Sequence, residues 1–235
     1  MRFYRIAPII FQWLIRLCTR FVFFTFAHLK VHGLSHLEML EAPVIFAANH
    51  LSEWDGPLIR SAMPMRSQFG PMFYVARGKG FYDKSGWRKY FYESPFFRLL
   101  GAYPAYTGTK DYAQALEHHI AILKDGGSVT IFPEGKRSTD GTIGEPKAGV
   151  VALSLMTKRP IVPVAITGLE NLNVSELFSG QPHVSSSFGE PLLFEELPNL
   201  VVPEDPETYK LGAVELMKRV SVLRSVLGNE LTNKK

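Results

Sequence analysis

The sequence predicts a single α/β domain whose mainly parallel sheet is flanked by helices, preceded by an N-terminal amphipathic helix. Two observations predict this fold: short apolar, β-branched runs alternate with longer helical patterns, and Gly or Pro stands at the junctions between them. Strands that alternate with helices in this way form parallel sheets with both faces covered. At 235 residues the chain has the length for one sizeable core. We therefore assign residues 1–29 to the helix and residues 30–235 to the domain.

The expected strands and helices follow one another along the chain. Apolar runs predict strands at residues 43–48, 72–76, 127–132 and 161–167. Periodic patterns predict helices at residues 57–64, 87–99, 110–125, 147–158 and 206–228. In such sheets the functional groups lie in loops just beyond the carboxyl ends of the strands. Two polar clusters, residues 49–55 and 133–138, lie at positions of this kind.

The first 29 residues form an amphipathic pattern rather than a uniformly apolar one. On a helix that turns about 100° per residue, one sector of about 100° holds Arg5, Gln12, Arg16, Thr19 and Arg20, while Ile10, Trp13, Leu14, Leu17 and Phe24 lie outside it. An arginine at mid-bilayer costs about 2.5 to 3.5 kcal/mol, so a helix in the membrane interface with its arginines in water is favoured over a span. A core-packing helix with its arginines outward is another alternative. The lack of a small-residue cleavage pattern disfavours a signal peptide.

Composition and charge exclude several classes of protein. With 46% hydrophobic and 20% charged residues the chain is apolar for a soluble enzyme, and a lipid-facing surface is one explanation. The net charge of +4 suits anionic membranes or phosphorylated substrates, whereas no basic run with interleaved aromatic residues supports nucleic-acid binding. Cys18 is the only cysteine, which excludes an intramolecular disulfide and a thiolate metal cluster. We expect a reducing setting, at the cytoplasmic face of a membrane.

The first polar cluster, in AANHLSEWDG at residues 47–56, combines a histidine with an aspartate. His50 and Asp55 would lie about 140° apart on a regular helix, so the pair belongs to a strand-to-helix turn. There Asp55 can accept a hydrogen bond from one ring nitrogen of His50 and leave the other nitrogen free as a base. No serine or cysteine is obviously paired with them apart from Ser52. The hydroxyl to be activated can therefore belong to a substrate.

Two other interpretations of this cluster stay open. In DGPL, Asp55 is a suitable N-cap and Pro57 a suitable first-turn residue, so the cluster can simply begin a helix. His50, Glu53 and Asp55 can also act as metal ligands, although no second histidine or dense group of carboxylates accompanies them. The metal alternative would make the protein a hydrolase in which His50 activates water.

The second cluster, FPEGKRSTDGT at residues 132–142, follows an expected strand. Glu134 and Gly135 stand where the chain must turn. Arg137 can hold a phosphate group in a bidentate fork, because its guanidinium presents two parallel N–H donors. The donors that this turn offers to an oxyanion are Lys136, Arg137 and Ser138. A solvated surface turn is the alternative.

Together the two clusters resemble a known family. NHLSEWDG and FPEGKRS, followed by PIVPVAITG, are similar to the sequence blocks of the PlsC-like glycerolipid acyltransferases, the 1-acylglycerol-3-phosphate acyltransferase type. The joint occurrence of the blocks in this order is more specific than any one of them. The resemblance covers roughly residues 30–190. It implies an enzyme that moves a fatty acyl group from a thioester to the free hydroxyl of a lysophospholipid, giving phosphatidate when the acceptor is 1-acylglycerol-3-phosphate.

The resemblance also implies how the reaction proceeds. His50 would be the general base that deprotonates the acceptor hydroxyl, and Asp55 would orient it. The acyl donor would be acyl-CoA or an acyl carrier protein, and no metal and no further cofactor would be needed. Membrane lipids would be the other partners. A different lysophospholipid or alcohol acceptor, or a His-dependent hydrolase, is the alternative function.

Together the residue pattern and the resemblance give these candidate substrate-binding residues: Arg77, Lys79, Glu134, Gly135, Arg137, Ser138 and Pro163. In the family, the block that contains Glu134, Gly135 and Arg137 is associated with the glycerol phosphate of the acceptor. Pro163 matches a proline near the acyl-donor side. The chain departs from the family at Thr107, which stands where an arginine is often found. The resemblance therefore leaves the phosphate contacts partly to Arg77, where the family commonly has a lysine, and to Arg137.

Overall fold

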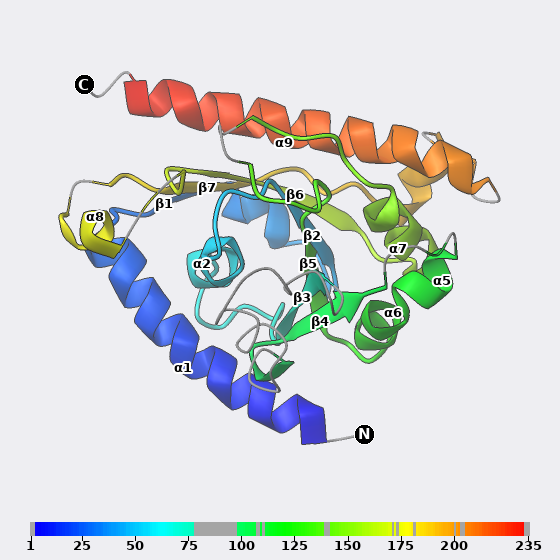
Figure 1. The fold of residues 1–235 in the computed structure, drawn as a ribbon, viewed down its shortest axis with the longest axis horizontal. Coiled ribbons are helices and arrows are strands. Elements are labelled where there is room, and N and C mark those ends of the chain that lie inside the picture. The colour runs from blue at the N-terminus through cyan, green and yellow to red at the C-terminus, as the bar shows by residue number, and fades with distance from the viewer. Residues whose placement is uncertain are drawn as a thin grey trace.

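In the described part of the chain, seven strands form one sheet with helices on both faces (Figure 1). The computed structural model describes residues 3–77, 98–106, 109, 111–138, 142–170, 172, 174–180, 182–199, 201–202 and 205–232. The strands are β1 (Lys30–His32), β2 (Ile45–Ala48), β3 (Met72–Arg77), β4 (Ala102–Ala105), β5 (Ser128–Ile131), β6 (Ile161–Thr167) and β7 (Ser185–Phe188). This architecture confirms the predicted fold class.

The sheet is mostly parallel. Its strand order is β1-β7-β6-β2-β5-β3-β4. Neighbouring strands from β6 to β4 pair in parallel, and β7 pairs with β6 in the antiparallel direction. β2 therefore lies between β6 and β5, in the middle of the sheet. Parallel strands end at the same edge, so the loops that follow β2 and β5 begin side by side.

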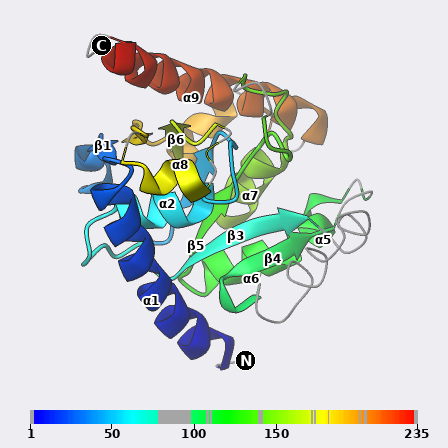
Figure 2. The ribbon, with the colours of Figure 1, turned by 60° about the vertical axis from the view of Figure 1, so that its left-hand side comes forward.

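Different helices cover the two faces of the sheet (Figure 2). The helices are α1 (Phe3–Thr25), α2 (Asp55–Ala62), α5 (Tyr112–Ala115), α6 (Glu117–Lys124), α7 (Gly149–Thr157), α8 (Val174–Phe178) and α9 (Tyr209–Thr232), with 3₁₀ turns at Leu34–Leu37, Phe194–Asn199 and Pro206–Thr208. α1 and α2 pack on one face, where they share a core with β2 and β6. α6, α7 and α9 share a core on the other face.

β2 shows why the sheet needs both layers. All four of its residues are buried. Phe46 and Ala48 belong to the core beneath α1 and α2, whereas Ile45 and Ala47 belong to the core beneath α6 and α7. Successive side chains of a strand point to opposite faces, so an uninterrupted apolar run must be covered on both.

Most of the predicted elements are confirmed, and the differences have physical reasons. The expected helix at 110–125 is two helices, α5 and α6, because Leu116 between them leaves helical geometry. Three strands were missed: β1 and β4 are only three and four residues long, and β7 contains three serines and so has no apolar signal. Most of the expected helix at 87–99 lies outside the described residues.

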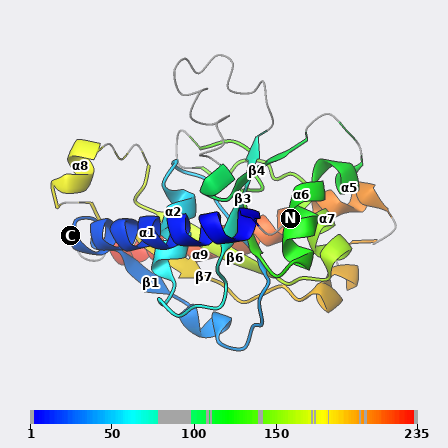
Figure 3. The same ribbon diagram turned by 90° about the horizontal axis from the view of Figure 1, so that it is seen from below.

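The orientation predicted for the arginines of α1 is wrong. Arg16 and Thr19 are buried, at 2% and 8% exposure, against α2. The opposite side of α1 faces outward, as Figure 3 shows along the length of the helix. We define this α1 apolar face by its exposed residues, Ile9, Ile10, Trp13, Leu14, Leu17, Phe21 and Phe24. The side chain of Arg5 lies outside the described residues.

Backbone carbonyls explain why the arginines turn inward. The last carbonyl groups of a helix have no intrahelical partner. Arg16 donates hydrogen bonds to the carbonyls of Met63, Pro64 and Met65, at 2.8, 2.6 and 3.1 Å, just beyond the end of α2. Arg20 donates to the carbonyl oxygens of Ser61 and Met63. Cations also interact favourably with the negative end of the helix dipole.

Among the helices that the structure describes, none is both long and apolar enough to cross a membrane.

Candidate active site

The site lies at the carboxyl edge of the two central strands. His50 is the second residue after β2, and the loop with Glu134 follows β5. β2 and β5 are hydrogen-bonded neighbours, with Ala47 opposite Ile131. The two polar clusters of the sequence therefore meet in space, as their positions after expected strands predicted.

His50 and Asp55 form a direct hydrogen bond. The distance from His50 Nδ1 to Asp55 Oδ2 is 2.7 Å. Asp55 is completely buried, and the side chain of His50 is 22% exposed. The His50 ring also stacks on Phe132, with the ring centroids 4.2 Å apart. Because an ionised carboxylate can only accept, Nδ1 carries the proton and Nε2 presents its lone pair as a base.

Asp55 does not cap α2, so the capping interpretation is wrong in its detail. The helix begins at Asp55 itself, and Trp54 in the N-cap position makes no side-chain cap. Asp55 Oδ2 instead accepts the backbone N–H groups of Leu51 and Ser52, at 2.6 and 2.9 Å. These bonds fold the loop back onto the carboxylate. The negative charge still lies in the first turn of α2, where the helix dipole favours it.

The structure does not support the metal interpretation. Among the described residues no group of three His, Cys, Asp or Glu side chains is arranged to hold a metal ion. Glu53, the third ligand of that interpretation, forms an ion pair with Arg137 at 3.1 Å. His50 and Asp55 alone are too few ligands for a protein metal site.

The loop after β5 clamps the backbone of His50 from both sides. Glu134, which is 5% exposed, accepts the N–H of His50 on Oε1 at 2.9 Å and the N–H of Gly144 on Oε2 at 2.7 Å. The N–H of Ser138 donates to the carbonyl oxygen of His50 at 2.8 Å. Both oxygens of Glu134 thus bind backbone groups. Glu134 therefore helps to hold the backbone of His50 in position.

Gly135 forms the turn between these contacts, and two cationic side chains lie close to it. Its φ is +65°, in the left-handed region that favours glycine. Arg77, at the end of β3, donates to its carbonyl oxygen from Nε at 2.7 Å and also from Nη2. A β-carbon added at Gly135 would lie 2.9 Å from Cε of Lys147, so the Lys147 side chain crosses the turn.

The remaining predicted substrate-binding residues do not all lie near His50. Arg137 is exposed, and its pair with Glu53 is exposed as well. Pro163 is buried inside β6, opposite Ala47 of β2. The structure therefore brings Arg77, Glu134, Gly135, Arg137 and Ser138 to the His50 loop but leaves Pro163 within the sheet. Lys79 and Thr107 lie outside the described residues.

Sequence reasoning missed two residues of the site. Asn49, 1% exposed, binds the backbone of Ile166 twice: its Nδ2 donates to the carbonyl oxygen at 3.0 Å and its Oδ1 accepts the N–H at 2.8 Å. These bonds fix the end of β2 to β6. A buried polar residue directly before His50 was the available signal. Lys147 gave no signal, because only the folding of the loop brings it over Gly135.

The sequence is also similar to known proteins. The model of a family described as Acyltransferase matches residues 28–167, which is more than half of the chain and includes both clusters. The chain belongs to this acyltransferase family. The match begins near the end of α1 and ends with β6, so the family region holds every described strand except β7.

Curated relatives of the acyltransferase match only over part of their length. A chloroplastic 1-acyl-sn-glycerol-3-phosphate acyltransferase of Arabidopsis thaliana is 26% identical over 146 residues, which are 62% of this chain and 37% of that protein. A probable 1-acyl-sn-glycerol-3-phosphate acyltransferase of Mycoplasma genitalium is 25% identical over 130 residues, 54% of this chain and 44% of that protein. The matched region thus spans less than half the length of these relatives.

A solved structure shares the fold. The 1-acyl-sn-glycerophosphate acyltransferase PlsC of Thermotoga maritima superposes with a TM-score of 0.58 at 23% sequence identity. The superposition covers 95% of this chain and 84% of that one. At this identity the likeness supports the α/β architecture, including the mostly parallel sheet.

Proposed function

We propose that this acyltransferase moves a fatty acyl group from a thioester to the free hydroxyl of a lysophospholipid, with 1-acylglycerol-3-phosphate as the acceptor. The observation that carries the proposal is the 2.7 Å hydrogen bond between His50 Nδ1 and buried Asp55, which leaves Nε2 free beside a cationic loop. Curated relatives named 1-acyl-sn-glycerol-3-phosphate acyltransferases support the choice of acceptor.

In the proposed mechanism His50 is the general base. Nε2 takes the proton of the acceptor hydroxyl while the oxygen attacks the thioester carbonyl carbon. The tetrahedral intermediate collapses, the C–S bond breaks, and the thiolate receives the proton from the imidazolium. Asp55 stabilises that imidazolium, because its buried carboxylate lies against Nδ1. The donor is acyl-CoA or an acyl carrier protein, and the steps use no metal and no other cofactor.

The cations around Gly135 are the proposed contacts for the acceptor phosphate. The exposed pair between Arg137 and Glu53 is weak, so Arg137 can exchange Glu53 for a phosphate group at little cost. Lys147 and Arg77 lie on the same turn. Glu134 and Ser138, in contrast, act on the reaction by holding the His50 backbone.

We also propose that the α1 apolar face lies in the surface of a membrane. Trp13 and Phe21 are 56% and 64% exposed, although the polar side of the same helix is buried against the protein. Exposed apolar patches of this kind mark membrane or protein contacts, and interfacial helices bind through aromatic and aliphatic residues. A Trp13→Ser/Phe21→Ser variant should cosediment with phosphatidylcholine vesicles much less than wild type. Equal cosedimentation would contradict the membrane contact.

A substrate panel tests the proposed reaction. Purified protein is given lysophosphatidate, other lysophospholipids or a phosphate-free alcohol, each with labelled acyl-CoA or acyl carrier protein, and the products are identified by mass. We expect acylation of lysophosphatidate to be fastest and the phosphate-free alcohol to be slowest. Release of free fatty acid without any acylated acceptor would contradict acyl transfer and favour a hydrolase. Equal rates for all acceptors would contradict the proposed phosphate contacts but not the proposed acyl transfer.

A further inference from the structure

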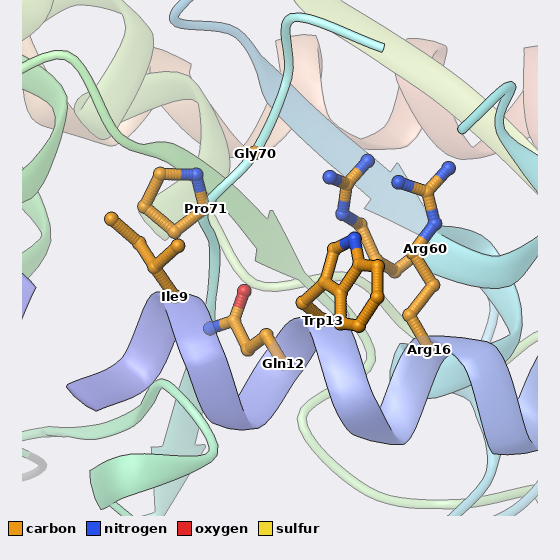
Figure 4. A pocket seen from close by; sticks show the side chains of 7 residues that line it. All are labelled: Ile9, Gln12, Trp13, Arg16, Arg60, Gly70 and Pro71. Atoms are coloured by element: carbon orange, nitrogen blue, oxygen red, sulfur yellow. The ribbon is translucent and has the colours of Figure 1, made fainter. Parts of the chain in front are cut away.

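A second group of arginines surrounds a cavity beneath α1, apart from the His50 loop. The cavity has a volume of about 180 Å³ and lies between α1 and the segment that leads into β3. Figure 4 shows Arg16 and Arg60 side by side at one end of it, with Trp13 next to them. Pro71, at its other end, precedes β3, whereas Arg77 ends that strand. At about 3.3 Å per residue, the cavity and the His50 loop lie near opposite ends of β3.

Arg60 is a partly buried cation for which the described residues provide no ion-pair or hydrogen-bond partner. Its Nη1 is inaccessible to solvent and forms no hydrogen bond. No carboxylate among the described residues forms an ion pair with it. Burial lowers the pKa of Arg60 because the charged form loses hydration. Such a charge is costly to bury unless an opposite charge is supplied.

Gly70 leaves room for the Arg60 guanidinium at the wall of the cavity. A β-carbon added at Gly70 would lie 2.3 Å from Arg60 Nη2, so any larger residue there would displace the group. Arg16 lies beside it, and its Nε is also buried without a partner. Burial and then the neighbouring charges of Arg60 and Arg20 lower the pKa of Arg16 to about 10. Arg60, whose guanidinium forms no hydrogen bond within the described residues, lines the cavity beside Arg16, whose Nη atoms bind backbone carbonyls. The two positive charges at the cavity form a site for an oxyanion.

We propose that this cavity binds the phosphate group of a membrane phospholipid. Planar guanidinium groups match the oxygens of a phosphate, and a phosphate would supply the missing negative charge. A lipid source is favoured because Ile9 and Trp13, both on the α1 apolar face, line the same cavity. When Arg60 holds the phosphate group of a phospholipid, the acyl chains of that lipid therefore lie beside exposed apolar side chains. This site is separate from the acceptor site proposed around Gly135.

The test compares Arg60→Met with Arg66→Met, which removes an equal charge from an exposed position nearby. In phosphate-free chloride buffer the thermal midpoint of Arg60→Met should equal or exceed that of wild type, because an unpaired buried charge has been removed. Inorganic phosphate at several times its Kd should raise the midpoint of wild type and of Arg66→Met by about 2 to 4 °C, relative to chloride at equal ionic strength. Arg60→Met should show no such rise.

Each measurement is repeated in the Arg137→Ala variant, which weakens phosphate binding at the proposed acceptor site. The phosphate-dependent rise should persist there and disappear when Arg60→Met is added. Monomeric dihexanoyl phosphatidate should then bind at least about tenfold more tightly than inorganic phosphate, because buried methylene groups add to the affinity.

Three results would overturn the proposal. A lower midpoint of Arg60→Met in phosphate-free chloride buffer would show that Arg60 has a structural partner. A phosphate effect that survives Arg60→Met would place the anion elsewhere. Equal affinities for phosphate and dihexanoyl phosphatidate would contradict the lipid source. Because the midpoints do not depend on turnover, failure of this proposal and failure of the proposed acyl transfer are distinguishable.

Discussion

The two ends of α2 carry opposite buried charges, and they come from different parts of the chain. At the N-terminus, Asp55 belongs to α2 itself and accepts two N–H groups of the preceding loop. At the C-terminus, Arg16 and Arg20 come from α1 and donate to the carbonyls at residues 61–65. Both arrangements complement the helix dipole. The first depends on neighbours in sequence and the second on the packing of a separate helix.

This difference assigns the two ends different tasks. At the N-terminal end the carboxylate of Asp55 also binds His50, which is partly exposed and faces the proposed substrates. At the C-terminal end the charges satisfy carbonyls and leave the apolar side of α1 exposed. We therefore expect changes at Asp55 to affect turnover most and changes at Arg16 to affect stability most.

Among the changes that leave His50 in place, Asp55→Asn should have the largest effect on turnover. The amide keeps the size of the side chain but removes the charge that stabilises the imidazolium. We expect kcat for acyl transfer to fall by about 10² to 10⁴, while circular dichroism stays unchanged. Glu53→Gln is the matched control, because Glu53 lies in the same loop but is exposed. Similar losses in both variants would show that Asp55 has no special role.

Glu134→Gln should have the next largest effect, because it acts on His50 through the backbone. Both carboxylate oxygens of Glu134 accept hydrogen bonds from backbone N–H groups. The glutamine amide would instead point its own N–H donors at one of these two backbone N–H groups. We expect kcat to fall by about 10- to 100-fold and the free energy of unfolding by about 1 to 3 kcal/mol. Exposed Glu145→Gln is the control. Full activity of Glu134→Gln would contradict the positioning role.

Arg16→Met should separate the two ends of α2. It leaves the carbonyls of Met63, Pro64 and Met65 without their donor, so we expect unfolding by urea to require about 1 to 3 kcal/mol less free energy. With monomeric substrates kcat should change less than threefold. Exposed Arg66→Met should leave stability unchanged. A large loss of kcat at unchanged stability would mean that the two ends are not separate.

His119, a buried residue of α6, should affect only the acid side of the stability profile. Burial lowers its pKa to about 4, from an ordinary value of 6.5. Above pH 6.5 both folded and unfolded chains hold it neutral. Between pH 6.5 and 4 the unfolded chain binds a proton that the folded chain does not, so stability falls as the pH falls, by up to about 1.4 kcal/mol per unit.

The urea midpoints of wild type and His119→Leu, measured from pH 7 to pH 4, check this effect. The variant should lose part of the pH dependence, whereas His118→Leu, at a more exposed position, should keep it. Identical slopes for wild type and His119→Leu would show that His119 is not the group responsible.

Local patterns predicted the central strands and the His50 turn, because each depends on residues close in sequence. β2 is an uninterrupted apolar run, and the polar residues after β2 and β5 had to meet at one edge of a parallel sheet. The orientation of α1 was not predictable in this way. Its periodicity defines two sides but not which of them faces the protein, since that depends on carbonyls 47 to 49 residues later in the chain.

The same limit applies to the rest of the site. Lys147 lies over Gly135 because its backbone N–H donates to the carbonyl oxygen of Pro133, and no spacing indicates that contact. The resemblance placed Glu134 with the acceptor, whereas its oxygens bind backbone groups that only the folded loops bring together. Polar groups whose partners are distant backbone atoms leave no pattern in the sequence.

A double-mutant cycle at His50 and Asp55 tests the central claim most directly. The rate of lysophosphatidate acylation is measured for wild type, His50→Ala, Asp55→Asn and the double variant, with circular dichroism to confirm folding. If His50 is the base and Asp55 acts only through it, His50→Ala loses at least about 10² in rate. The double variant is then no slower than His50→Ala within about threefold, since residues that act as a unit are not additive. Additive losses, or a His50→Ala protein as fast as wild type, would contradict the account.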